Sequence, residues 1–304
     1  MTDCFPQPFA RRRPLISVWP TGQLDSHAQL AEGRYIPETA QDLDRMPPAV
    51  AAHAIATYTR PGDTVLDPDC GAGTVLTEAL RSDRHAIGLT SQPRWWPVAR
   101  ANITAAKYDG ATPDGMVLDH SPALAATRLA GMSGHLALIL TALRPTASAH
   151  QSGRPGHVET ESDAPVGRLQ QALIECQPLL RSGGHIVVTV RPHRQRGRLL
   201  DLAGHAHEAA RAAGLMPVDR CVALLAELRG DRLLVPASMA QRRSVARHER
   251  ATGHPVTLPA HHDVLIFRAP DEAAAAAALR PPHLPQRPFA ESQAAHGDVP
   301  GEAA

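Results

Sequence analysis

The feature that most constrains the fold is a short apolar segment that ends in an acid and leads into a glycine-rich loop. Thr64 to Asp67 has the pattern of a buried strand, Gly71-Ala72-Gly73 follows, and Thr74 to Arg81 has the pattern of a helix. Glycines let a ligand approach the backbone, and a helix N-terminus presents unpaired N–H groups. This strand–loop–helix unit predicts a cofactor site.

Similar apolar segments alternate with helical patterns along much of the chain. The other expected strands are His85–Leu89, Met116–Asp119, Leu136–Leu140, His185–Val190 and Asp263–Arg268. The other expected helices are Pro47–Tyr58, Trp95–Ala106, Leu169–Leu180, which Arg181 to Gly184 terminates, and Leu199–Ala213. Val218 to Leu228 and Arg232 to Val235 flank Arg229-Gly230-Asp231 and predict a hairpin. The alternation predicts an α/β fold with a parallel sheet covered by helices.

The alternating region spans residues 46–270, and the composition changes on either side of it. Residues 1–45 are rich in Pro, Arg and polar residues, so we expect an extended N-terminal arm. Residues 271–304 predict a mostly disordered C-terminal tail, in which Glu272 to Leu279 has some helical potential. Residues 146–165 are polar and contain Gly, Pro and His, so they predict a disordered loop within the domain.

Charge, cysteine content and hydropathy exclude several classes of protein. The net charge is +1, so any contact with nucleic acid must depend on local arginine clusters. The four cysteines are scattered and form neither a CxxC pair nor a set with zinc-ligand spacing, so we expect no metal site. No apolar run approaches the roughly 18 residues of a membrane span, and no signal peptide is evident. We therefore expect a cytoplasmic protein.

Two kinds of cofactor use a glycine loop of this type. A dinucleotide site requires a third small residue where the loop enters its helix, for close packing of helix and strand. Here the pattern is Gly71-x-Gly73-x-x-Leu76, and leucine is too large for that position. The sequence therefore disfavours a nicotinamide-dependent oxidoreductase.

The segment Asp67-Pro68-Asp69-Cys70-Gly71-Ala72-Gly73-Thr74 resembles the D-P-F-C-G-S-G-T loop of amino-methyltransferases that use S-adenosylmethionine. These enzymes act on adenine N6 or cytosine N4 in DNA, or on guanine in tRNA. Other segments resemble the same family in order: Met46-Pro47-Pro48, Arg60 to Asp63, Gly88-Leu89, Pro93 to Trp95, Ala99 to Asn102, Leu179 to Gly184, Val188 to Pro192 and Asp263 to Arg268. The resemblance implies a Rossmann-like methyltransferase fold, mostly parallel with an antiparallel edge hairpin, and a nucleic-acid substrate.

The resemblance also implies roles for individual residues. The cofactor would be bound by Pro47, Asp67, Pro68, Cys70, Gly71, Gly73, Thr90 and Asp119. Asp67, Gly71 and Gly73 would line its methionine end, and Pro47 would close over it. Asp119, at the end of the third strand, would accept a hydrogen bond from the adenine amino group; the alternative is an exposed acid in a turn.

The chain departs from the family pattern at two places. The second strand of such enzymes ends in an acid that pairs with the ribose, whereas here it continues into Thr90 and Ser91. After the fourth strand the family has D/N/S-P-P-Y/F/W, which holds the target amino group and stacks on the flipped base. Here the corresponding residues are Thr141-Ala142-Leu143-Arg144-Pro145.

These departures leave two hypotheses. In an active methyltransferase, the Thr141 hydroxyl and the Ala142 carbonyl would accept from the amino group, and Arg144 would stack on the base. In a catalytically inactive relative, the same scaffold would bind nucleic acid or a partner.

Two arginine clusters are candidates for contact with nucleic acid. The first follows the fifth strand, at the sheet edge where α/β proteins bind ligands, and comprises Arg191, His193, Arg194, Arg196 and Arg198. The second is predicted to form one face of a helix and comprises Arg242, Arg243, Arg247, His248 and Arg250. The alternative for both clusters is a solvated surface in an arginine-rich protein.

Overall fold

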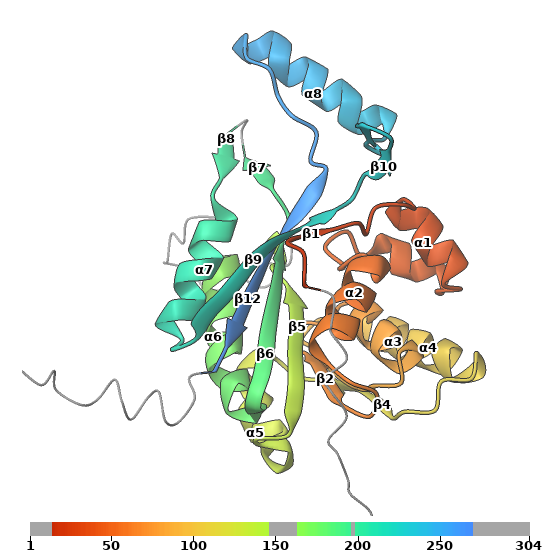
Figure 1. Cartoon of the computed structure of the whole chain (residues 1–304), viewed down its shortest axis with the longest axis vertical. Helices are drawn as coiled ribbons and strands as arrows, with labels where there is room; N and C mark the ends of the chain where they lie inside the picture. The colour runs from red at the N-terminus through yellow and green to blue at the C-terminus, as the bar shows by residue number, and fades with distance from the viewer. Residues whose placement is uncertain (1–13, 146–162, 196–197, 270–304) are drawn as a thin grey trace, which may run out of the picture. The chain divides into compact units, whose positions relative to one another are not determined.

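Eight strands form one mixed sheet in the computed structural model, which describes residues 14–145, 163–195 and 198–269 (Figure 1). From one edge to the other they are β1 (Val18–Trp19), β9 (Met216–Leu224), β12 (His261–Arg268), β6 (Leu180–Val190), β5 (Leu136–Ala142), β2 (Thr64–Asp67), β3 (His85–Thr90) and β4 (Gly115–Asp119). Strands β6, β5, β2, β3 and β4 are parallel to one another.

The strand order β4–β3–β2–β5–β6 is that of a Rossmann-like sheet, in which the order reverses between the first and fourth strands. Here the switch point lies between β2 and β5. Ligands of open α/β sheets bind outside the carboxyl ends of the strands at such a point. The predicted α/β class is confirmed, and the predicted glycine loop follows a strand at the switch point.

The antiparallel element of the sheet differs in detail from our prediction. The hairpin around Arg229 to Asp231 forms, but β10 (Glu227–Arg229) and β11 (Arg232–Leu234) make a separate two-stranded sheet. The antiparallel strand of the main sheet is β12, which lies between β6 and β9 and pairs with both. A second small hairpin joins β7 (His193–Gln195) to β8 (Arg198–Leu200).

Helices cover both faces of the sheet (Figure 1). The helical elements are α1 (Ser26–Glu32), η1 (Pro37–Gln41), α2 (Pro48–Tyr58), α3 (Thr74–Arg81), α4 (Trp95–Tyr108), η2 (Pro122–Leu124), α5 (Ala125–Arg128), η3 (Ala130–Met132), α6 (Asp163–Cys176), η5 (Gln177–Leu179), α7 (Leu202–Ala212) and α8 (Met239–Thr252). One core cluster joins α2, α3 and α4 to the sheet, and the other joins α5, α6 and α7.

The central strand β5 contributes to both layers because successive side chains point to opposite faces. Leu138 and Leu140 belong to the α2–α4 layer, and Ile139 belongs to the α5–α7 layer; all three are fully buried. This explains why the strand reads as a continuous apolar run.

Two predicted boundaries need correction. The predicted disordered loop at 146–165 overlaps α6, which begins at Asp163; residues 146–162 lie outside the described residues. The predicted helix stop from Arg181 to Gly184 is instead part of β6, because the chain turns through η5 directly into the strand. The helical potential of Glu272 to Leu279 also falls outside the described residues. None of the described helices is both long and apolar enough to span a membrane.

The predicted N-terminal arm contains secondary structure in its described part, which differs from the extended conformation that we expected. β1 pairs in parallel with β9, and α1 and η1 follow it. Trp19 and Leu30 are buried. The elements have two, seven and five residues, which is too short for clear periodicity in the sequence.

A single buried amide ties this segment to the glycine loop. Asn102, on α4, is fully buried. Its Nδ2 donates to the Thr39 hydroxyl at 2.7 Å and to the Ala72 carbonyl at 2.9 Å. Its Oδ1 accepts the N–H of Ile36 at 3.0 Å.

We predict that Asn102→Ala lowers the free energy of unfolding by about 1–3 kcal/mol, because it leaves buried polar groups without partners. Urea denaturation followed by circular dichroism measures the change. Thr104→Ala, on the exposed side of the same helix, is the control and should change stability by less than about 0.5 kcal/mol. Equal stability of the two variants would show that the amide does not anchor the segment.

Candidate functional site

The glycine loop joins β2 to α3 at the switch point and has a fixed conformation. Gly71 and Gly73 have φ values of +49° and +82°, in the left-handed region that glycine adopts without strain. Gly73 is the N-cap residue of α3. The N–H of Cys70 donates to the carbonyl of Leu89 at 2.9 Å, which ties the loop to the neighbouring strand β3.

Leu76, the residue that disfavoured a dinucleotide site, packs against a glycine of the neighbouring strand. A Cβ atom at Gly88 would lie only 2.5 Å from Leu76 Cδ1. The close approach of helix and strand therefore depends on a glycine in β3, whereas the dinucleotide fingerprint places it in the helix.

Asp67 connects the two strands of the switch point. It is buried, its Oδ1 accepts the N–H of Asp69 at 3.1 Å, and its side chain is hydrogen-bonded to Thr141 at the end of β5. Burial, together with the nearby charge of Asp69, raises the pKa of the Asp67 carboxyl to about 7. The hydrogen bonds and the charge of Arg144 offset part of this increase.

A cavity of about 140 Å³ lies at the carboxyl edge between the loop, the ends of β3 and β5, and α6. Among the predicted site residues, Pro68, Thr141, Ala142 and Arg144 line it. Ser91 and Ser121 also line it. Ligand pockets usually have volumes of about 300 Å³ or more, so a cofactor of ordinary size requires side chains to move.

Several predicted cofactor residues do not belong to the described lining of this cavity. Thr90 is fully buried, and its hydroxyl bonds to the backbone of Gln92. Asp119 is exposed at the end of β4. Pro47 is buried at the start of α2, and Cys70 is buried beneath the loop, where burial raises the pKa of its thiol.

Arg144, which we predicted to stack on a base, is part of a buried ion pair. Its side chain is 6% exposed, and its Nη2 lies 2.6 Å from Oδ1 of Asp42, which is 1% exposed. Its Nε lies 3.8 Å from Oδ2 of Asp69. Burial lowers the pKa of Arg144, but the two carboxylates raise it more, so the guanidinium stays charged. Sequence reasoning missed Asp42 because it lies in the predicted arm and belongs to no motif.

The first arginine cluster is exposed where it is described. Arg191 follows β6, and its Nη1 donates to the Leu43 carbonyl at 3.4 Å. Arg194 is exposed on β7. Arg196 lies outside the described residues.

One family model matches the part of the chain that contains the glycine loop. The model of a family described as DNA methylase matches residues 10–97, which include the glycine loop and amount to less than a third of the chain. This match confirms, over these residues, the resemblance to nucleic-acid amino-methyltransferases. No curated protein matches the chain.

Similar solved structures include proteins of several kinds. TrmN from Thermus thermophilus is 14% identical with a TM-score of 0.47; the match covers 78% of this chain and 53% of TrmN. A TehB-like S-adenosylmethionine-dependent methyltransferase from Corynebacterium glutamicum is 15% identical with a TM-score of 0.42, covering 80% of this chain and 97% of that one. A precorrin 8w decarboxylase from Methanobacterium thermoautotrophicum is 16% identical with a TM-score of 0.45; the match covers 76% of this chain and 94% of the decarboxylase.

We predict that Asp67→Asn reduces the pH dependence of stability. A carboxyl whose pKa is raised in the folded state stabilises the protein fully below its unfolded pKa, near 3.8, and this contribution is lost as the pH rises through about 7. Between about pH 4 and pH 8, the free energy of unfolding of the wild type should therefore fall by at most about 4 kcal/mol relative to that of the variant. Urea denaturation at several pH values measures this difference.

The control is Asp114→Asn, which removes a carboxylate that is 96% exposed. Its stability should follow the wild type across the same pH range. If the free energies of unfolding of the wild type and of Asp67→Asn change in parallel with pH, Asp67 does not titrate as described.

Proposed function

We propose that the protein transfers a methyl group from S-adenosylmethionine to an exocyclic amino group of a base in DNA or tRNA. The observation that carries the proposal is the Asp67 to Thr74 loop at the switch point, within the residues that match the DNA methylase family. When bound, the cofactor supplies an electrophilic methyl group on a sulfonium centre.

The residues at the carboxyl edge suit such a cofactor in part. Gly71 and Gly73 add no side chain of their own to the loop, although Asp42 and Arg144 fill the space above Gly71. Ser91 lines the cavity, and its hydroxyl would accept from ribose hydroxyls as a neutral and weaker partner than the usual acid. We therefore expect the protein to bind the cofactor less tightly than relatives that retain the acid.

The target amino group would approach Thr141 and Ala142, which line the cavity at the end of β5. The Thr141 hydroxyl and the Ala142 carbonyl are hydrogen-bond acceptors for an amino group. Transfer between a positioned amine and the methyl group depends mainly on proximity and orientation, so few catalytic side chains are required.

Tritium-labelled S-adenosylmethionine, incubated with the protein and with total host DNA or tRNA, tests this function. We expect label in one of the two nucleic acids, and Thr141→Val should reduce its incorporation by about tenfold or more if the hydroxyl orients the amine. Cofactor affinity, measured in parallel, should change little in this variant. Bound cofactor without any transfer would reject catalysis.

That last outcome would support a second candidate function, a catalytically inactive protein that binds nucleic acid on the same scaffold. It is favoured by the segment from Thr141 to Pro145, which has no aromatic ring to stack on a base. Arg144 does not replace the ring, because it is paired with Asp42.

Both candidate functions include a nucleic-acid surface, and α8 has the charge for one. Arg242, Arg243, Arg247 and Arg250 are exposed, and their spacing puts them on one face of the helix. Glu249, the single acid of α8, accepts the N–H of Val256 at 3.0 Å. α8 and the β7–β8 hairpin lie toward the end of the domain at which β6 finishes (Figure 1). An arginine face beside the carboxyl edge suits a phosphate backbone.

We predict that replacing Arg243, Arg247 and Arg250 together with Gln weakens binding to duplex DNA or tRNA. If each arginine neutralises one phosphate, the slope of log affinity against log salt should decrease in magnitude by about 2–3. Fluorescence anisotropy at several salt concentrations measures this slope.

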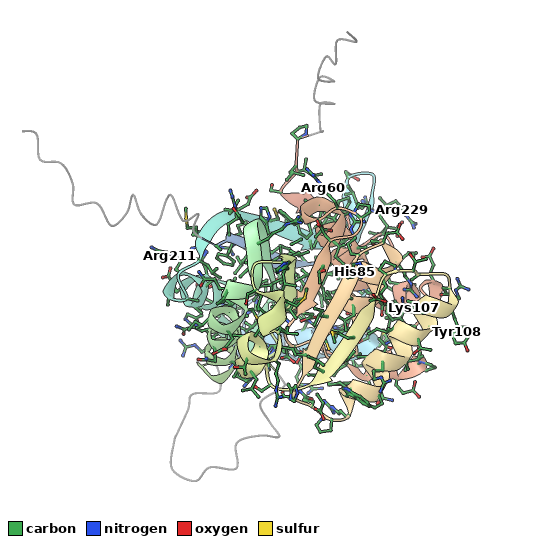
Figure 2. The ribbon with its side chains drawn as sticks, turned by 90° about the horizontal axis from the view of Figure 1, so that it is seen from below. Arg60, His85, Lys107, Tyr108, Arg211 and Arg229 are labelled. Atoms are coloured by element: carbon green, nitrogen blue, oxygen red, sulfur yellow. The ribbon has the colours of Figure 1, made fainter. Side chains whose placement is uncertain are left out.

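The matched control removes three positive charges outside α8: that of Arg60, which follows α2, and those of Lys107 and Arg211, in the last turns of α4 and α7 (Figure 2). The control should leave the slope unchanged. An equal decrease in both triple variants would indicate that net charge matters and that α8 is not the contact surface.

A further inference from the structure

A carboxylate of the chain itself lies against the glycine loop. Asp42 follows η1, and its Oδ2 accepts the N–H of Ala72 at 2.9 Å. Donation from a loop N–H to a carboxylate is the interaction by which loops of this kind hold anionic ligands. The N–H of Ala72, between the two glycines, is therefore already hydrogen-bonded to Asp42.

The space directly above Gly71 is also filled by this carboxylate and its partner. A Cβ atom at Gly71 would overlap Oδ2 of Asp42 and would lie 2.6 Å from Nη1 of Arg144. The glycine thus leaves room for an ion pair, in the place where a glycine loop usually leaves room for a ligand.

Arg144 faces both this ion pair and the cavity. It lines the cavity together with Asp69 and Thr141. Its Nε is buried and has no hydrogen-bond partner among the described residues, although Asp69 lies 3.8 Å away. A buried guanidinium N–H without an acceptor, at the wall of a cavity, is a ready donor for a ligand carboxylate.

We propose that Asp42 occupies the carboxylate subsite of the cofactor cavity, and that Arg144 receives the carboxylate of an adenosyl amino acid when this ligand replaces Asp42. The inference rests on the proposed function, because it takes the ligand to be S-adenosylmethionine or its demethylated product. The exchange keeps one carboxylate beside Arg144, so the guanidinium is paired before and after binding. Asp42 is then an internal competitor, which weakens binding of ligands that carry the amino-acid tail.

Calorimetry with two ligands tests this role without requiring catalysis. S-adenosylhomocysteine carries the amino-acid carboxylate, whereas 5′-methylthioadenosine has the same nucleoside and lacks it. We expect Asp42→Asn to bind S-adenosylhomocysteine at least tenfold more tightly than the wild type does, with less than a twofold change for 5′-methylthioadenosine. Asp114→Asn, the same substitution at an exposed site, should change neither affinity.

The inference is wrong if Asp42→Asn binds both ligands with the affinities of the wild type, or if its affinity increases equally for both. If the single variant does not fold because Arg144 loses its partner, Asp42→Asn with Arg144→Gln replaces the pair by neutral hydrogen-bonding groups. This double variant should bind the two ligands within twofold of each other, and a tenfold preference for S-adenosylhomocysteine would overturn the role of Arg144. Absence of binding of either ligand to any folded form would instead reject the cofactor and, with it, the proposed function.

Discussion

The buried ion pair between Asp42 and Arg144 joins three parts of the chain that are far apart in sequence. It connects the segment after η1 to the end of β5, and through the N–H of Ala72 it reaches the glycine loop. A guanidinium that is 6% exposed is tolerated only with a carboxylate beside it. The position of the N-terminal segment and the shape of the cavity therefore depend on the same contact.

The fold was predictable where the sequence pattern is long and apolar. The predicted bounds of β2 and α3 agree with the structure, because a buried strand, a glycine turn and an amphipathic helix each have a strong local pattern. The segment from β1 to η1 was not predictable, since its elements are short and are held by tertiary contacts such as those of Asn102. The position of β12 between β6 and β9 also depends on pairing that no local pattern encodes.

Only the backbone framework of the candidate site could be predicted from the sequence. The loop, its glycines and the location of Thr141 follow from the motif and from the order of the strands. The pairing of Arg144 with Asp42 could not be predicted, because Asp42 lies in a segment without periodicity and the sequence there does not indicate which residues it contacts. The raised pKa of Asp67 likewise comes from complete burial beside a second carboxylate, which only the folded chain produces.

The order of the strands also has a consequence for synthesis on the ribosome. β12 is the last described strand, yet it lies inside the sheet, between β6 and β9, and β9 in turn carries β1. Until residue 268 has left the exit tunnel, the edges of β6 and β9 that pair with β12 have no partner. The half of the sheet from β4 to β6 is able to assemble earlier, so this protein should depend on chaperones mainly late in translation.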